Sequence, residues 1–355
     1  MHSFRDLDRH FGSVSQALLN LLTAAEKAAG RQQAFADQHP QQLETLRQVA
    51  RIQSAEASNA IENIRAPKKR IEELVNETTE PKNRSEQEIA GYRFVLDTIH
   101  GNAKDIDFEP KYVEQLHGSM ARFTGDTTAG KWKKLDNEVE EELPDGTKKT
   151  RFKPLPADQT PDAMEELHRR FNEEMASGNY HFLLLAAAYV FDFTAIHPFR
   201  DGNGRMSRLI TLWLLYLGDY SVGRYISLEK IIEDSKETYY EALKKSTQGW
   251  REAEHDLQPW VGYLLGIINA AYTEFEKRTE VVAGQGSKRK LVESFIATSL
   301  KNEFSMADIR QACPGVGDAY IKQILQELKA RGVVASQGRG RGAKWKRLRS
   351  DFLDD

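Results

Sequence analysis

Two strongly apolar segments, separated by a short polar stretch, constrain this chain more than any other feature. The segments are residues 180–196 (YHFLLLAAAYVFDFTAI) and residues 209–218 (LITLWLLYLG). Each is apolar nearly all round and too long for a single strand, so each is expected to be a buried helix. The stretch between them, residues 197–208 (HPFRDGNGRMSR), is therefore expected to be a loop that runs into a helix start.

The middle of this polar stretch has residues suited to binding phosphate. Gly202, Asn203 and Gly204 can turn several backbone N–H groups toward one point, and a helix beginning near Gly204 would direct its positive end to the same point. Arg205 and Arg208 are three residues apart and so share a helix face. Two guanidiniums on one face can bind separate phosphates through paired hydrogen bonds.

Two further side chains in the stretch suit group transfer. Asp201 offers a hard oxygen ligand for a Mg²⁺ ion that bridges phosphates. His197 has an ordinary pKa near 6.5 and can accept a proton at neutral pH. Any one of these residues alone is more simply explained as part of a buried turn with surface arginines. Together, at this spacing, they indicate a Mg-dependent phosphoryl or nucleotidyl transferase.

The stretch resembles the signature of the Fic (Fido) family, His-x-Phe-x-Asp/Glu-Gly-Asn-Gly-Arg-x-x-Arg, and matches it at every position. The resemblance implies a protein adenylyltransferase, which moves AMP from ATP to a protein hydroxyl with Mg²⁺ as cofactor. It implies that His197 is the catalytic base and that Asp201 holds the metal. The implied ATP-binding residues are Asp201 through the metal, Gly202, Asn203 and Gly204 at the anion hole, and Arg205 and Arg208 at the outer phosphates.

A second resemblance lies ahead of the signature, within residues 51–65. Ser58 and Glu62 are four residues apart and would lie on one helix face, which Asn63 could help to end. This spacing alone indicates no function. However, Ser58-Asn-Ala-Ile-Glu62-Asn63 resembles the inhibitory motif Ser/Thr-x-x-x-Glu-Gly/Asn of Fic proteins. That resemblance implies that Glu62 pairs with Arg208 and so hinders productive binding of the γ-phosphate.

Residues 130–156 are the one clear β candidate, and Asp145-Gly146 is typical of a hairpin turn. Opposite charges facing across the strands favour a particular register. The expected pairs are Glu142 with Lys149, Glu140 with Arg151, and Val139 with Phe152. The hairpin could be solvated and without a role, but the family resemblance implies a flap that aligns a target segment by strand addition.

Tyr239 and Tyr240 occur together in an apolar-periodic stretch, residues 227–246. As helix residues they could be core or surface aromatics. The family resemblance implies that aromatics at this place flank the adenine, so both are candidate ATP-binding residues. Elsewhere, the single cysteine, Cys313, cannot form an internal disulfide and is expected to be a packing residue.

The C-terminal part differs from the rest in charge. Residues 281–287 have the composition of a linker, and residues 288–349 contain 14 Lys/Arg and 5 Asp/Glu, a balance of +9 in a chain of net charge −3. Helices are expected at 290–300, 305–312 and 318–331, followed by two strands. This order resembles a winged helix-turn-helix, which implies binding of duplex DNA, with Arg339 and Arg341 on the wing. Protein contact or dimer packing is the alternative.

The expected fold class is mainly α, with a Fic-type helical core, a small β-hairpin flap and a C-terminal winged helix-turn-helix. The expected parts are N-terminal helices (1–84), a catalytic core (85–280), a linker (281–287) and the winged helix (288–355). No membrane span or signal peptide is evident, so a cytoplasmic protein is expected. A protein hydroxyl docked on the flap, self-modification and a homodimer are the other expected interactions. AMP removal, or regulation by a nucleotide-sensing DNA-binding protein, are the rival functions.

Overall fold

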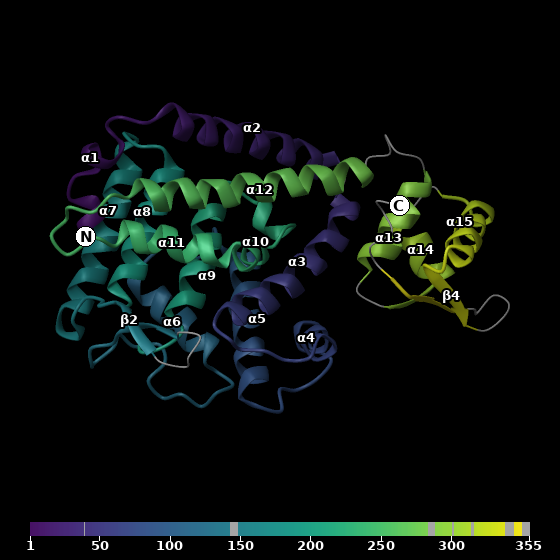
Figure 1. Ribbon diagram of the computed structural model, residues 1–355, viewed down its shortest axis with the longest axis horizontal. Helices are drawn as coiled ribbons and strands as arrows, with labels where there is room; N and C mark the ends of the chain where they lie inside the picture. The colour runs from purple at the N-terminus through teal and green to yellow at the C-terminus, as the bar shows by residue number, and fades with distance from the viewer. Residues whose placement is uncertain are drawn as a thin grey trace. The chain divides into compact units, whose positions relative to one another are not determined.

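The computed structural model is mainly helical, as the sequence predicts, and it carries two small antiparallel sheets (Figure 1). It describes residues 1–38, 40–142, 148–282, 288–299, 302–313, 316–337 and 344–349. The chain forms two compact units, which we call unit 1 (residues 1–31 and 50–272) and unit 2 (residues 32–49 and 273–355). Unit 2 thus begins ahead of the expected linker at 281–287, of which residues 283–287 lie outside the described part.

The first half of the chain is helical up to the flap. Its elements are η1 His2–Phe4, α1 Leu7–Phe11, α2 Gln16–Gln38, α3 Pro40–Ile61, α4 Lys68–Val75, α5 Arg84–Asn102 and α6 Pro110–Met120, followed by strands β1 Val139–Glu142 and β2 Lys148–Phe152. After the flap come η2 Ala157–Gln159, α7 Thr160–Ser177, α8 Phe182–Ile196, α9 Asn203–Leu217, η3 Val222–Arg224, α10 Leu228–Asp234, α11 Lys236–Ser246 and α12 Gln258–Val282.

Helices α8 and α9 form the centre of unit 1, as their sequence predicts. In α8 every residue except Phe182 and Thr194 is buried. The two helices pack against each other, α8 also packs on α7, and α9 also packs on α5. Because α8 and the later turns of α9 are apolar on nearly all sides, burying them among neighbours is the only arrangement that removes their apolar surface from water. The polar stretch between them is consequently fixed at both ends by core helices.

The flap forms as a hairpin, but its predicted register is only partly right. Val139 pairs with Phe152 as expected, whereas the other expected pairs are wrong. The observed pairs are Glu140 with Thr150, Glu141 with Lys149, and Glu142 with Lys148. The cause is a β-bulge next to Val139, which leaves Arg151 as the extra residue on β2. The expected turn at Asp145-Gly146 lies outside the described residues.

Unit 2 contains the C-terminal elements in the expected order, with one addition. They are α13 Lys288–Thr298, β3 Glu303–Ser305, α14 Met306–Ala312, α15 Asp318–Ala330, β4 Val334–Gln337 and β5 Lys344–Arg347. The sheet order is β3-β5-β4, all antiparallel. The three-residue strand β3 was missed because its sequence is too short to show a period. Cys313 is buried in the unit's apolar core, which confirms its packing role.

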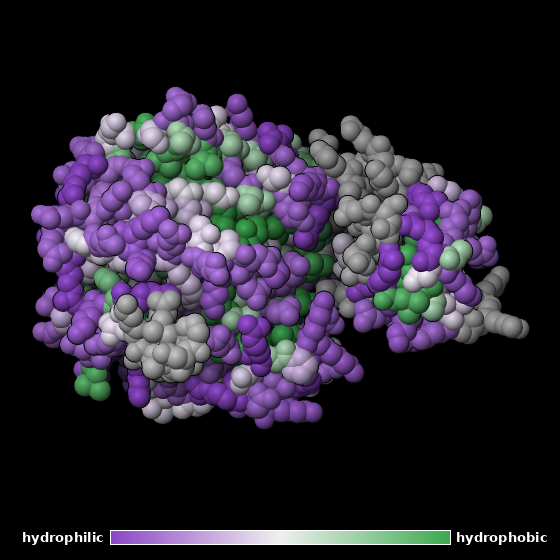
Figure 2. Space-filling view, viewed as in Figure 1, coloured by the Kyte–Doolittle hydropathy of each residue, from purple (hydrophilic) through white to green (hydrophobic). Residues whose placement is uncertain are grey.

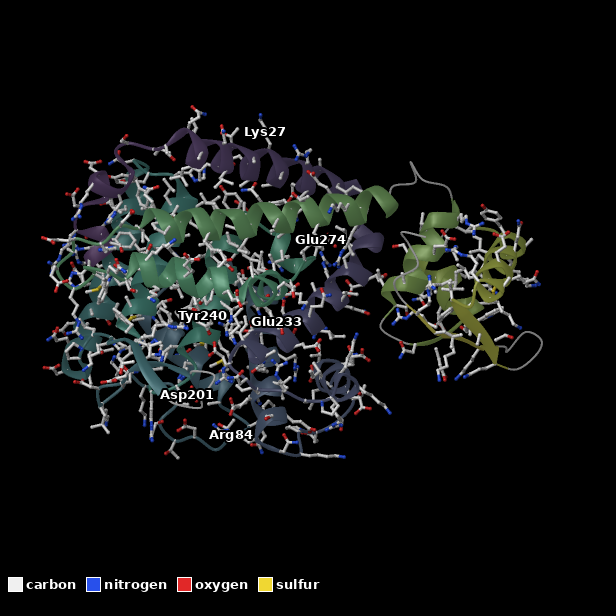
Figure 3. The ribbon with its side chains drawn as sticks, in the orientation of Figure 1. Lys27, Arg84, Asp201, Glu233, Tyr240 and Glu274 are labelled. Carbon is white, nitrogen blue, oxygen red and sulfur yellow. The ribbon has the colours of Figure 1, made fainter. Side chains whose placement is uncertain are left out.

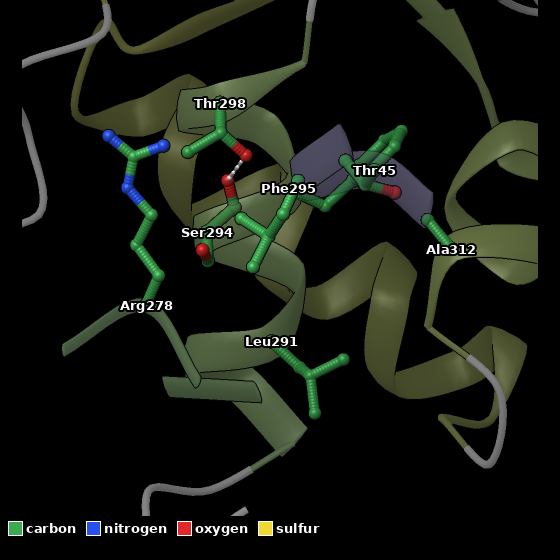
Figure 4. Close-up of a pocket in the computed structure, with 8 residues that line it drawn as sticks. Thr45, Arg278, Leu291, Ser294, Phe295, Thr298 and Ala312 are labelled. Carbon is green, nitrogen blue, oxygen red and sulfur yellow. Dashed lines mark hydrogen bonds between the residues drawn. The ribbon is translucent and has the colours of Figure 1, made fainter. Parts of the chain in front are cut away.

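Unit 2 also has a small cavity of about 60 Å³ (Figure 4). It is lined by Thr45, Leu46, Arg278, Leu291, Ser294, Phe295, Thr298 and Ala312. Its size admits little more than water, so it is a poor candidate for a substrate site. Figure 2 shows a face on which hydrophilic residues predominate and apolar residues form small groups. Within the described residues, no helix combines the length and apolarity that a bilayer crossing requires.

Candidate active site

The larger cavity lies in unit 1, where α9 begins. Its volume is about 320 Å³, a size that suits a small-molecule ligand. Its lining includes every residue predicted for catalysis and ATP binding, together with Glu62 of the predicted inhibitory motif. Those residues are His197, Asp201, Gly202, Asn203, Gly204, Arg205, Arg208, Tyr239 and Tyr240. Of these, Asp201 and Tyr240 are labelled in Figure 3. The structure thus brings together residues up to 178 positions apart in the chain (62 to 240).

His197 caps the C-terminal end of α8 in a left-handed conformation, with φ at 54°. Its backbone N–H donates to the Phe193 carbonyl at 3.0 Å, and its ring Nδ1 lies 3.4 Å from the Thr194 carbonyl. Because a carbonyl only accepts, this contact favours the tautomer with the proton on Nδ1 and the lone pair on Nε2. Burial lowers the pKa of His197 to about 4, so the ring is neutral and able to accept a proton at neutral pH.

Helix α9 begins at Asn203, one residue before the predicted start, and its N-cap is Gly202 with φ at 76°. This positive φ is a backbone conformation that residues with a Cβ rarely adopt, so the turn favours glycine for a conformational reason. The Asn203 side chain closes the turn: its Oδ1 accepts from the Phe199 N–H and its Nδ2 donates to the Phe199 carbonyl, both at 2.8 Å. Asn203 therefore shapes the helix start with its side chain and leaves the backbone N–H groups for an anion.

The predicted inhibitory motif holds Arg208 from the other side of the cavity. Arg208 is buried, and its Nη2 donates to Glu62 Oε1 at 2.7 Å. Its Nε donates to Ser58 Oγ and its Nη2 to the Ser58 carbonyl, both at 2.8 Å. Burial lowers the pKa of Arg208, but the Glu62 carboxylate outweighs that effect, and the net shift is upward. The guanidinium is therefore fully charged, and Ser58 of α3 and Glu62 just after it are its hydrogen-bond acceptors.

Glu62 also occupies the space in front of the α9 N-terminus. A Cβ built on Gly204 would lie only 2.3 Å from Glu62 Oε1. The carboxylate therefore lies beside the first turn of α9, close to the position of an anion bound by its first N–H groups. A phosphate at that place would meet both steric overlap and a like charge.

Asn63 follows the end of α3, the helix of the predicted inhibitory motif, as its sequence suggests. It adopts the left-handed conformation with φ at 62°, and the N–H of Ile64 donates back to the Asn59 carbonyl at 3.0 Å. Lys236 of α11 donates to the Ile61 carbonyl at 2.7 Å, at the same helix end. These contacts fix the point at which Glu62 leaves the helix.

Arg205 has a partner that the sequence did not indicate. Its Nη1 donates to Glu88 Oε2 of α5 at 2.8 Å, and the residue is buried. Its Nε is buried and has no hydrogen-bond partner within the part of the chain that the structure describes. A phosphate oxygen would satisfy this donor, which fits a nucleotide in the cavity. Glu88 was missed because it lies 117 residues from Arg205 and carries no motif of its own.

The two predicted adenine-site tyrosines both line the cavity. Tyr239 is buried and its ring lies 5.1 Å from the Tyr240 ring. The guanidinium of Arg151, the extra residue of the flap bulge, lies 4.2 Å from the Tyr240 ring centroid. Burial raises the pKa of both hydroxyls, so neither tyrosine is ionised at neutral pH. The sequence did not indicate Arg151 at this site because the bulge that turns it there has no local signal.

Asp201 is exposed at the cavity, and its Oδ1 accepts from the Gly202 N–H at 2.6 Å. No cluster of three or more His, Cys, Asp or Glu side chains suited to a metal occurs among the described residues. A single carboxylate beside a phosphate cradle fits a Mg²⁺ ion that takes most of its ligands from phosphates and water. The donor set is thus compatible with the predicted metal, and Asp201 is the residue that would hold it.

Behind the loop, His117 of α6 supports the site without lining the cavity. Its ring is stacked on Phe199, with centroids 3.7 Å apart and planes 5° apart. Its Nδ1 accepts from the Gly130 N–H at 2.9 Å, so its Nε2 carries the proton and donates to the Asp201 carbonyl at 3.0 Å. Burial lowers the pKa of His117 to about 4, which keeps this tautomer neutral.

Comparison with known proteins supports the resemblance to the Fic family that the sequence indicated. Residues 107–215 match the model of the Fic/DOC family. Among solved structures, a Fic family protein from Desulfovibrio desulfuricans is similar at a TM-score of 0.62 and 22% identity, covering 95% of this chain and 97% of that one. A Fic domain-containing signaling protein from Bacteroides thetaiotaomicron has a TM-score of 0.55 and 20% identity, covering 73% and 95%.

A fragment of Fic-1 from C. elegans is also similar, with a TM-score of 0.56 and 15% identity, covering 75% of this chain and 73% of that one. At these identities the structural likeness establishes the fold. The family match covers the flap, α8 and α9, while Glu62, Tyr239 and Tyr240 of the cavity lie outside it. The chain therefore has a Fic-type fold and contains, at residues 107–215, a Fic/DOC family domain.

Proposed function

We propose that this protein transfers AMP from Mg-ATP to a hydroxyl of a target protein, with His197 as the general base. Fic domain proteins generally transfer AMP or other nucleotide-linked groups onto proteins. The observation that carries the proposal is one cavity in which a neutral histidine, a helix N-terminus and two arginines converge. A protein hydroxyl that docks on the flap, from a partner or from this chain itself, is the acceptor.

The transfer step follows from this arrangement. Nε2 of His197 takes the proton as the target oxygen bonds to the α-phosphorus in line with the departing oxygen, and pyrophosphate leaves. The first N–H groups of α9 stabilise charge on the phosphate oxygens, and Arg205 and Arg208 hold the outer phosphates. Mg²⁺ bound through Asp201 supplies charge neutralisation for the phosphates.

The same proposal includes autoinhibition. Arg208 cannot hold the γ-phosphate while it is bound to Ser58 and Glu62, and the Glu62 carboxylate lies where the phosphate would be. ATP that enters beside Glu62 must bind in another pose, one in which the α-phosphate is not in line for attack. Withdrawal of Glu62 would free both the arginine and the cradle.

A labelling experiment separates this chemistry from its enzymatic rivals. Glu62→Gly protein is incubated with a cell lysate and ATP labelled at either the α- or the γ-phosphate, with Glu62→Gly/His197→Ala as the control. AMP transfer leaves protein-bound label from the α-labelled ATP only. Retention of γ label would instead identify phosphoryl transfer. In the rival of AMP removal, Glu62 positions a water, so Glu62→Gly would slow the release of AMP from a modified protein.

A second candidate function concerns unit 2, which we propose is a winged helix-turn-helix that binds duplex DNA. Along α15 the buried residues alternate with an exposed polar face. That face presents Lys322, Gln323, Gln326 and Lys329. A helix of this kind following α14 is the arrangement that enters a major groove. Lys322→Ala/Lys329→Ala should weaken binding to a labelled duplex and reduce its salt dependence. Wild-type protein that binds no duplex at low salt would exclude this function.

A further inference from the structure

The loop that carries His197 is held from outside the cavity by a segment that the proposed mechanism does not use. This segment, residues 131–138, is the last part of the connection between α6 and the flap strand β1. Lys133 lies within it and is only 5% exposed. Neither Lys133 nor Asn137 is among the described residues that line the cavity. Any effect they have on transfer is therefore indirect: it passes through the loop and, for Lys133, also through its positive charge, which helps burial to lower the pKa of His197.

Lys133 contacts the loop at two points. Its Nζ donates to the Ile196 carbonyl at 3.0 Å and to Asn137 Oδ1 at 2.8 Å. Its backbone N–H donates to the Pro198 carbonyl at 2.8 Å. A buried ammonium is tolerated only where oxygen acceptors compensate its lost hydration, and these carbonyl and amide oxygens do so. The loop carbonyl groups therefore stabilise the buried ammonium, and the ammonium in turn stabilises this conformation of the loop.

Asn137 donates hydrogen bonds to the two loop carbonyls that Lys133 does not contact. With Oδ1 turned toward Lys133, its Nδ2 donates to the His197 carbonyl at 3.3 Å and to the Phe199 carbonyl at 3.0 Å. The four consecutive carbonyls of residues 196–199 thus all accept from Lys133 or Asn137. The Lys133–Asn137 hydrogen bond fixes which way the amide faces, so the two side chains act as one unit.

The need for this support is visible in the backbone of His197. A left-handed conformation at a residue other than glycine is strained and persists only where surrounding contacts impose it. Among the described residues, the one hydrogen-bonding contact of the His197 ring is a long one of 3.4 Å with the Thr194 carbonyl. The direction of the imidazole is therefore set mainly by the backbone of the loop, and that backbone is held by its carbonyls.

We infer that Lys133 and Asn137 are a pair of positioning residues, which hold the α8–α9 loop in the left-handed turn that directs His197 into the cavity. The inference rests on the proposed role of His197 as the base. It concerns the rate of the chemical step more than nucleotide binding, because the pair touches neither Arg208 nor the first turn of α9. Lys134, the next residue, is exposed and offers a matched control.

The test uses the full chain with Glu62→Gly as background, so that transfer is not held back by the inhibitory helix. Lys133→Met removes the ammonium at nearly constant length, Lys133→Arg keeps the charge, and Asn137→Ala removes the amide from a less buried site. Lys134→Met is the control. We expect Lys133→Met and Asn137→Ala to lower kcat about 10- to 100-fold, since small displacements of a reacting group have effects of this size. The KM for ATP should change less than about 3-fold, and Lys133→Arg should restore part of kcat.

Hydrogen exchange of the peptide covering residues 194–204 provides a readout that does not depend on activity. Exchange should be faster in Lys133→Met and Asn137→Ala than in Lys134→Met, with melting temperatures checked for each variant. Unchanged kcat and unchanged exchange in Asn137→Ala and in folded Lys133→Met would overturn the inference. If the Glu62→Gly background transfers nothing, the proposed function fails on that result, and the exchange data alone decide whether the pair holds the loop.

Discussion

Glu62 Oε1 and Arg208 Nη2 lie 2.7 Å apart, and they join the helix that precedes the core to the last arginine of the phosphate-binding stretch. The arginine side chain is 3% exposed and the carboxylate 33%. A buried cation is thus held by a carboxylate that solvent can reach. Such a pair can be opened from the carboxylate side without unfolding the core, which is the property that a reversible brake requires.

Removing the carboxylate should therefore activate the protein. A hydrogen bond to a charged group contributes about 1.5–3 kcal/mol, so Glu62→Gly should raise the rate of AMP transfer by about 10- to 150-fold. Glu56→Gly on the same helix is the control, because Glu56 has no place in the cavity. The rates are measured by transfer of α-labelled AMP. Equal rates for wild type and Glu62→Gly would show that the ion pair is not inhibitory.

A second set of contacts, made by α3 one turn before Ser58, should strengthen the proposed autoinhibition. Ser54, one turn before Ser58, donates from Oγ to Glu229 Oε2 at 2.7 Å, and its Oγ lies 2.9 Å from Ser227 Oγ. Tyr92 donates to the other oxygen of Glu229 at 2.9 Å. Ser54→Ala leaves the buried carboxylate short of a donor, at a cost of about 1–3 kcal/mol.

We expect Ser54→Ala to lower the free energy of unfolding by about that amount and to raise transfer in the otherwise wild-type chain, though less than Glu62→Gly does. Ser177→Ala, at an exposed site, is the control. Urea unfolding and label transfer are measured on the same preparations. Loss of stability with no gain in transfer would show that Ser54 supports the fold and not the brake.

His197 should stay neutral well below the ordinary histidine range. Burial lowers its pKa to about 4, so its ring resonances in the nucleotide-free protein should titrate near pH 4, with His197→Ala used for assignment. Because the folded-state pKa lies below the unfolded value near 6.5, the unfolded chain takes up this proton first, and stability falls as the pH drops from 6.5 toward 4. Titration near pH 6.5 would contradict the buried, neutral base.

Arg151 should contribute to nucleotide binding through Tyr240. A cation–π contact of this kind is worth about 0.5–2 kcal/mol, so Arg151→Ala should raise the KM for ATP by about 2- to 30-fold in the Glu62→Gly background. The exposed Lys153→Ala is the control on the same side of the flap. A kcat that falls while KM stays constant would instead place Arg151 with the acceptor.

The sequence was most informative where function depends on neighbouring residues. Buried α8 and α9, the helix start at Asn203 and the left-handed helix end at Asn63 all follow from local pattern. The Glu62–Arg208 pair spans 146 positions, and only the family resemblance predicted it. Residue types and spacing alone gave no reason to connect those two side chains.

What could not be predicted depends on long-range packing. Glu88, Lys133 and Asn137 reach the site through contacts that no local period or spacing records. The flap register was wrong by one residue beyond Val139 because a bulge without glycine leaves no sequence signal. Arg151, the extra residue of the same bulge, is the one whose guanidinium lies over the Tyr240 ring.

Intact mass of the purified chain tests the central claim most directly. Wild type, Glu62→Gly and Glu62→Gly/His197→Ala are incubated with ATP and Mg²⁺ and then weighed. The account predicts a gain of one adenylyl group in Glu62→Gly, little or none in wild type, and none in the double variant. An equal gain in the double variant would contradict the role of His197, and an equal gain in wild type would contradict the brake. If no variant gains mass, self-modification is excluded; if lysate proteins then take up no α label either, AMP transfer by this protein is contradicted.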